Sequence, residues 1–310
     1  MSAEGGESRG AILAALGANL GIAASKFVAF LLTGSSSMLA ESVHSVADSG
    51  NQALLLVGGA RAKRASTPAH PFGYGRERYF YAFLVAMVLF SIGSLFALYE
   101  GWHKLQNPHP VDSPQIAFGV LIVAIFLEGF SLRTAVRASN KVRGTASWVT
   151  FIRRAKSPEL PVVLLEDFAA LVGLMLALCG VGLSVVTGDG TWDAIGTMSI
   201  GVLLGVIAII LAIETKSLLL GEGASPDAVR RIERALVGPG VDRVIHLRTM
   251  HLGPDELLVG AKISVPASAH GAEIAEAIDA AERRVRAAEP LARVIYLEPD
   301  LDRGIARDQP

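Results

Sequence analysis

Six stretches of the chain are long and apolar enough to cross a lipid bilayer. A bilayer core about 30 Å thick needs roughly 20 mostly apolar residues per helix. The candidate stretches are 12–32, 38–60, 80–102, 116–132, 162–186 and 195–213. With 51% hydrophobic and 18% charged residues, the chain is also more apolar than soluble domains usually are. The sequence therefore predicts a polytopic α-helical membrane protein with a six-helix transmembrane bundle.

Basic residues are sorted between the connections that join these stretches. Five Lys or Arg residues lie in 61–78 and seven in 133–159, whereas the turns at 34–37, 107–113 and 188–191 have none. The positive-inside rule places the basic loops in the cytoplasm. We therefore expect a cytoplasmic tail at 1–10, a transmembrane domain at 11–220 and both termini in the cytoplasm. The basic loops are topology signals, and no nucleic-acid partner is predicted.

A second domain follows the last apolar stretch. Glycines and a proline at 221–226 indicate a hinge. The pattern beyond it predicts a helix, two strands around a Gly-Pro turn, an amphipathic helix and a last strand. We thus expect a cytoplasmic α+β domain of αββαβ order at 227–300, with two helices covering a three-stranded sheet, and a tail at 301–310. A domain this small gains stability by pairing with a copy of itself, so we predict a homodimer.

The second stretch carries four polar residues where a membrane helix should be apolar. Glu41, His44, Asp48 and Asn51 are spaced by three, four and three residues, which places them on one helical face. An ionisable residue inside a span costs about 2.5–3.5 kcal/mol on insertion scales. This energetic cost favours a functional role for these polar residues. The alternative is that these groups only pair with one another to hold helices together.

The fifth stretch adds the neighbouring carboxylates Glu166 and Asp167. Adjacent helical residues diverge by about 100°, so the two can hardly face the same centre. An imidazole with carboxylates suits Zn²⁺, Co²⁺, Fe²⁺ or Mn²⁺ better than Ca²⁺ or Mg²⁺. We therefore predict a metal site that contains His44, Asp48 and Asp167.

Other polar residues could support this site. Glu41 and Asn51 are candidates to orient His44, and Glu128 in the fourth stretch could be a counter-charge or proton carrier. Lys26 in the first stretch has the same alternatives, or it could snorkel to the interface. Asp193 lies near the end of the sixth stretch, where water is close, and we assign it no role.

Four motifs in order carry a family resemblance. They are 39–48 (LAESVHSVAD), 70–76 (HPFGYGR), 252–254 (LGP) and 296–300 (YLEPD). Together they resemble the cation diffusion facilitator family from about residue 15 to 300, and in particular a divergent branch that includes a mitochondrial zinc transporter. The resemblance implies a dimeric, proton-coupled metal exporter with a metallochaperone-like cytoplasmic domain. It maps the family's ligands in the second span onto His44 and Asp48, and one ligand in the fifth onto Asp167.

The chain departs from the family pattern at several ligand positions. The remaining ligand in the fifth span falls on Val163, which leaves Glu166 as the candidate to supply a replacement oxygen. In the loop, His70 is retained as a weak candidate, but Tyr74 stands where a second His can occur. The ligand positions of the soluble domain hold Ile245, Lys262 and Glu298. We therefore expect the dimer to hold without metal.

The combined reading is a secondary transporter, not an enzyme, that has no resident cofactor. It exports a divalent metal, Zn²⁺ first and Mn²⁺, Fe²⁺ or Co²⁺ as alternatives, in exchange for protons by alternating access. We expect it in the lipid of a bacterial inner membrane. The rival readings are a non-transporting metal sensor or scaffold and an intramembrane metal-dependent hydrolase.

Overall fold

The computed structural model describes residues 4–302, with side chains described over 19–302. The predicted tails at 1–10 and 301–310 fall partly outside this range. The chain divides into two compact units, Met1–Ala60 with Tyr79–Lys216 and Arg61–Arg78 with Ser217–Pro310. Each unit is described by itself.

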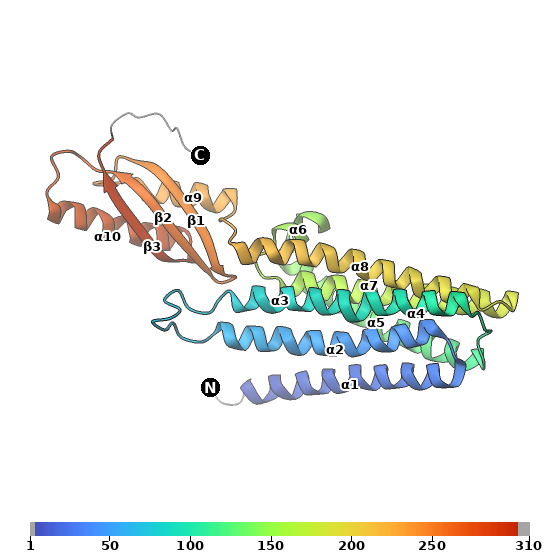
Figure 1. Ribbon diagram of the computed structural model, residues 1–310. Helices are drawn as coiled ribbons and strands as arrows, with labels where there is room; N and C mark the ends of the chain where they lie inside the picture. Colours follow the sequence, from blue (N-terminus) through green and yellow to red (C-terminus); the bar gives the residue numbers. More distant parts are fainter. Residues whose placement is uncertain (1–3, 303–310) are drawn as a thin grey trace. The chain divides into compact units, whose positions relative to one another are not determined.

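The first unit is a bundle of long helices that lie side by side (Figure 1). The elements that build it are α1 (Glu4–Thr33), α2 (Ser36–Ala62), α3 (Glu77–Val88), the π-helical η1 (Leu89–Ser94), α4 (Leu95–Gln106), α5 (Pro114–Arg143), α6 (Trp148–Arg154), α7 (Glu159–Thr187) and α8 (Thr191–Leu220). Because η1 joins α3 to α4, Glu77–Gln106 forms one long helical segment. The segment 133–159, predicted as a loop, is largely helical. Hydropathy marks only the apolar part of α5, whereas six of the eleven residues of its basic end, 133–143, are Arg, Lys or Ala, which are good helix formers.

Four helical segments of the described chain are long and apolar enough to cross a membrane: Glu77–Gln106, Pro114–Arg143, Glu159–Thr187 and Thr191–Leu220. A fifth apolar segment, Asn19–Thr33, is shorter. Helix α2 is long enough, but its polar residues lower its hydropathy, and it is not among the four. Length and composition therefore identify a helical bundle of membrane type with four apolar helices, fewer than the six predicted.

Helices α4 and α8 pack at very short range. A Cβ atom added to Gly101 would lie 2.6 Å from Met198 Cγ, and one added to Gly201 would lie 2.8 Å from Leu98 Cγ. Ser94, the last residue of η1, donates a hydrogen bond of 2.8 Å to the carbonyl oxygen of Gly201. Small residues let membrane helices approach closely enough for van der Waals packing and interhelical hydrogen bonds. This seam therefore holds α4 and α8 together.

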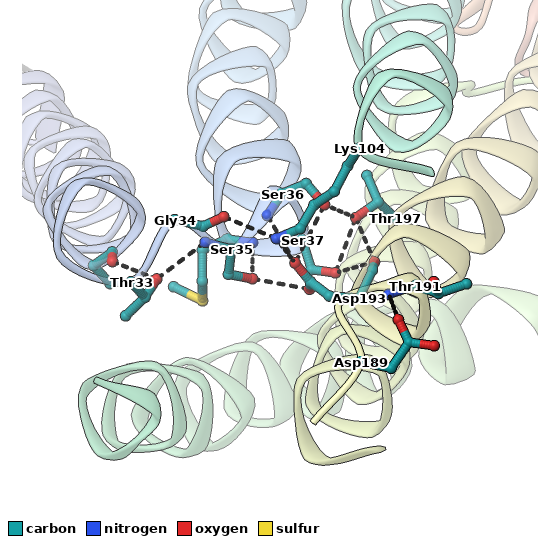
Figure 2. A network of polar contacts seen from close by, with 12 residues as sticks. Thr33, Gly34, Ser35, Ser36, Ser37, Lys104, Asp189, Thr191, Asp193 and Thr197 are labelled. Atoms are coloured by element: carbon teal, nitrogen blue, oxygen red, sulfur yellow. Dashed lines mark hydrogen bonds and ion pairs between the residues drawn. The ribbon is translucent and has the colours of Figure 1, made fainter. Parts of the chain in front are cut away.

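One end of the bundle contains a buried polar network around Asp193 (Figure 2). The Asp193 carboxylate accepts hydrogen bonds from Ser35 Oγ at 2.9 Å, from the Ser36 backbone N–H at 2.9 Å and from Lys104 Nζ at 2.8 Å. Lys104 Nζ also donates to the Gly34 carbonyl oxygen at 2.9 Å. The expectation that Asp193 is close to water was wrong, because its side chain is fully buried. The network ties the α1–α2 turn to α4 and α8.

The second unit contains a three-stranded sheet and two helices in the predicted αββαβ order. They are α9 (Pro226–Leu236), β1 (Arg243–Gly253), β2 (Glu256–Ser264), α10 (Gly271–Ala288) and β3 (Ala292–Asp300). Strand β2 is central, antiparallel to β1 and parallel to β3. Alternate residues of β2 pack against α9 and α10: Leu257, Val259, Ala261 and Ile263 meet Ile232, Leu236, Ala277, Ala281 and Val285. Ser225 caps α9 by accepting a hydrogen bond from the Ala228 N–H.

The segment 61–78, predicted as a loop of the transmembrane domain, belongs to this second unit. Gly75 approaches the β1–β2 turn so closely that an added Cβ would lie 2.7 Å from the Leu252 carbonyl oxygen. An added Cβ on Gly253 would lie 2.9 Å from Gly75 Cα. Arg78 forms an ion pair of 2.9 Å with Asp255. The glycines of two motifs that are distant in sequence therefore make one backbone contact, which hydropathy alone could not indicate.

Candidate functional site

A small polar cavity of about 60 Å³ lies among helices α1, α2, α5 and α7. Its acidic residues come from three helices: Asp48 from α2, Glu128 from α5 and Asp167 from α7. The remaining lining residues are Asn19, Ile22, Ser45, Gln52, Leu127 and Ser131. Carboxylates that share a cavity inside a bundle of apolar helices are typical of sites that bind a cation or carry protons.

Helix α2 presents its polar residues toward the inside of the bundle. Glu41, His44 and Asn51 are almost completely buried, and the side chain of Asp48 is 16% exposed. His44 Nε2 lies 3.5 Å from Asp48 Oδ2. Within the described part of the chain, neither ring nitrogen of His44 has a hydrogen-bond partner, and the same holds for Asp48 Oδ1. These atoms remain available to bind a ligand, since buried polar atoms otherwise find partners.

The two neighbouring acids of α7 are directed to different partners. Asp167 lines the cavity and accepts a hydrogen bond of 2.9 Å from Ser131 Oγ of α5. Glu166 is buried, does not line the cavity, and accepts a hydrogen bond of 2.6 Å from Asn51 Nδ2. The divergence of adjacent helical positions explains this division. Asn51 therefore contacts Glu166, and no hydrogen bond joins it to His44 in the described structure.

The predicted ligands do not form a finished metal site. Among residues 19–302, whose side chains are described, no three His, Cys, Asp or Glu residues are arranged to hold one ion. His44 and Asp48 are neighbours, and Asp48 shares the cavity with Asp167 and Glu128. Val163, which stands where the family pattern has a ligand, packs in an apolar cluster with Ala135, Phe151 and Leu164.

Lys26 of α1 was a residue with several possible roles, and the structure gives it specific partners. Its Nζ donates to Glu41 Oε2 at 3.0 Å and to Ser45 Oγ at 2.8 Å. Both charged side chains are fully buried. The sequence shows Lys26 as an isolated cation, because the pairing depends on how α1 packs against α2. The sequence signal for this pairing is one Lys and one Glu in neighbouring apolar stretches, Lys26 and Glu41.

The weaker candidates lie in the second unit. His70 is exposed, and its ring lies against the Tyr74 ring at an angle of 32°, with the centroids 4.6 Å apart. Lys262 forms ion pairs with Glu298 at 3.0 Å and with Asp300 at 3.3 Å. Hydrogen bonds to Glu298 and then Asp300 raise the pKa of Lys262, so its ammonium group stays protonated. A lysine thus supplies the positive charge at the position where the family pattern has a ligand.

Comparison with known proteins decides the family. Residues 12–220 match the family model described as the cation efflux transmembrane domain. The chain belongs to the cation efflux family. This is the family of metal transporters also called cation diffusion facilitators, so the membrane character of the four apolar helices is that of an integral membrane protein.

Several curated proteins resemble this cation efflux protein. Over 224 residues it is 34% identical to the mitochondrial proton-coupled zinc antiporter SLC30A9 of Xenopus laevis, covering 71% of this chain and 40% of that protein. It is 30% identical to metal tolerance protein C4 of Arabidopsis thaliana, covering 83% and 57% of the two chains. It is 28% identical to the cation-efflux pump FieF of Escherichia coli, covering 81% and 79%. The chain thus spans about 40% of the length of the SLC30A9 relatives that it matches.

Proposed function

We propose that this chain is a secondary transporter that exports a divalent transition metal, Zn²⁺ first, in exchange for protons by alternating access. The observation that carries the proposal is the cavity that Asp48, Glu128 and Asp167 line from three helices. The relatives support both the metal and the counter-ion, because they include proton-coupled zinc antiporters and a cation-efflux pump. Alternating access exposes such a site first to one side of the membrane and then to the other.

In this proposal α1 and α2 also cross the membrane, which with the four apolar segments gives six spans. Membrane helices tolerate ionisable residues that face the bundle interior or a polar cavity, as those of α2 do. The basic loops then place both termini in the cytoplasm, in a bacterial inner membrane. The second unit would form the homodimer, and because Lys262 stands where the family pattern has a ligand, we expect that pairing to need no metal.

We propose His44, Asp48 and Asp167 as the primary ligands of the transported ion. We propose Glu128 as the fourth ligand, because it shares the cavity with Asp48 and Asp167. Glu166 supplies a ligand only if its hydrogen bond to Asn51 breaks. Loading an ion draws α2 toward α7, since the ligands must approach to about 2.0–2.2 Å from a zinc ion. Ligands release protons when they bind metal, which couples the two fluxes.

Purified protein in liposomes tests this function. Entry of Zn²⁺, Mn²⁺, Fe²⁺ and Co²⁺ is followed together with lumenal pH for the wild type and for Asp48→Asn, Asp167→Asn and Glu128→Gln. Asp189→Asn is the matched control, because this exposed acid lies in the α7–α8 turn. The proposal expects metal flux with opposite proton flux in the wild type and the control, and little in the other three.

The outcomes separate the rival readings. Normal transport by both Asp variants would overturn the proposed site. A larger loss of metal flux for Glu166→Gln than for Glu128→Gln would identify Glu166 as the fourth ligand. Metal binding without flux in the wild type would favour a sensor or scaffold, for which the apolar packing of Val163 is the supporting observation.

A further inference from the structure

The buried ion pair between Lys26 and Glu41 stands immediately beside the proposed transport site. Neither side chain has any solvent exposure, and the Nζ–Oε2 distance is 3.0 Å. Glu41 is three residues before His44, on the same face of α2. Charges buried together are tolerated only when their hydrogen bonds are well satisfied. Lys26 meets this condition through two partners, whereas Glu41 does so only in part.

The second oxygen of Glu41 is directed toward α7. Oε1 lies 2.6 Å from the position that a Cβ of Gly173 would occupy. Within the described structure this buried atom has no hydrogen-bond partner. One oxygen of the carboxylate is therefore bound by Lys26, whereas the other is left without a hydrogen bond beside α7, which carries the proposed ligand Asp167.

Ser45 connects the ion pair to the acidic cavity. Its hydroxyl accepts the second hydrogen bond of Lys26 at 2.8 Å, and the residue also lines the cavity with Asp48, Glu128 and Asp167. Because Lys26 donates to the oxygen, the hydroxyl proton of Ser45 is free to point elsewhere. The ammonium charge of Lys26 thus lies one side chain behind the wall of the cavity.

We propose that Lys26 is an affinity-setting residue of the transport site: its fixed positive charge weakens the attraction of the acidic cavity for a divalent cation enough to permit release. The inference rests on the proposed function. The carboxylates of Asp48, Glu128 and Asp167 line the cavity, Glu41 adds a fourth in the ion pair, and the ammonium group of Lys26 contacts Glu41 and Ser45. Conduction and transport need a site that binds strongly enough to load and weakly enough to unload. The ion pair adjusts this balance without occupying a ligand position.

The test uses variants that change charge in opposite directions with little change of shape. Lys26→Gln leaves Glu41 uncompensated and should lower the KM for Zn²⁺ about tenfold while also lowering the maximal rate, because release becomes slow. Glu41→Gln leaves the ammonium uncompensated and should raise the KM about tenfold. The double variant Lys26→Gln with Glu41→Gln restores the balance, and its KM should return toward the wild-type value. Lys26→Arg keeps the charge and should keep the KM.

A purely structural role of the pair predicts a different pattern. Both single variants would then reduce the amount of folded transporter, with an unchanged KM or with shifts in the same direction, and either result would overturn the inference. Should Lys26→Gln fail to fold, Glu41→Gln and the double variant still decide it through the sign of their shifts.

Binding of Zn²⁺ to the detergent-purified protein separates this inference from the proposed function. The wild type and the same variants are titrated against a fluorescent zinc indicator, a measurement that needs no flux. Opposite shifts of the dissociation constant support the role of Lys26 even if the wild type does not transport. Unshifted constants, with active transport by the wild type, overturn the role of Lys26 and leave the transporter intact.

Discussion

Replacing Asp193 with Ala should destabilise the helical bundle by about 3–5 kcal/mol, the usual cost of removing one partner of a buried ion pair. Asp193 is fully buried, and Lys104 is 3% exposed. The substitution would leave the Lys104 ammonium with its hydrogen bond of 2.9 Å to the Gly34 carbonyl oxygen. It would also remove the acceptors of Ser35 Oγ and of the Ser36 N–H at the start of α2. The lost cap of α2 is included in this range, because contributions within one network are not additive.

The assay is denaturant unfolding of the detergent-purified protein, followed by its helical circular dichroism. Asp189→Ala is the matched control, because Asp189 is exposed and caps the start of α8 by accepting a hydrogen bond of 2.9 Å from the Thr191 N–H. Asp189→Ala should lower the free energy of unfolding by clearly less than Asp193→Ala does. The double variant Asp193→Asn with Lys104→Met should cost less than the two single losses added together. A loss below about 1 kcal/mol for Asp193→Ala would equal that of a surface ion pair and would refute the reasoning.

Three further perturbations follow from the packing. Gly101→Ala should destabilise the bundle by about 1–3 kcal/mol through the overpacked α4–α8 seam, whereas Gly119→Ala, with open space around its Cβ position, should be nearly neutral; equal losses would contradict the seam. Gly75→Ala should release segment 61–78 from the β1–β2 turn and speed its amide hydrogen exchange, and unchanged exchange would argue against the contact. Ser131→Ala removes the hydrogen bond to Asp167 and should reduce zinc flux about tenfold, as loss of a ligand-orienting partner does; full activity would show that Asp167 needs no orientation.

The contrast between Glu166 and Glu128 shows where sequence reasoning reaches its limit. Helical periodicity correctly indicated that Glu166 and Asp167 diverge. It could not say which of them faces the cavity, or that Glu128 of a different helix joins Asp167 there. The family resemblance left Glu166 as the candidate for the oxygen missing at Val163, but Glu166 accepts a hydrogen bond from Asn51 and does not line the cavity.

Segment 61–78 shows a similar limit for domain boundaries. Hydropathy and basic residues mark where apolar helices end, so they assign the segment to the membrane domain. The structure groups it with the C-terminal sheet, through the close backbone contact of Gly75 with Gly253. No local pattern encodes such a contact.

The sequence by itself determined the apolar helices, the αββαβ order of the second unit and the common face of Glu41, His44, Asp48 and Asn51. These features depend on periods of 3.6 and 2 residues, which are local properties of the chain. Only the tertiary structure decided that Lys26 pairs with Glu41 and that Asp193 is buried with Lys104. The partner of a buried charge depends on the rotation and depth of the neighbouring helices, and those are fixed by the packing of the whole bundle.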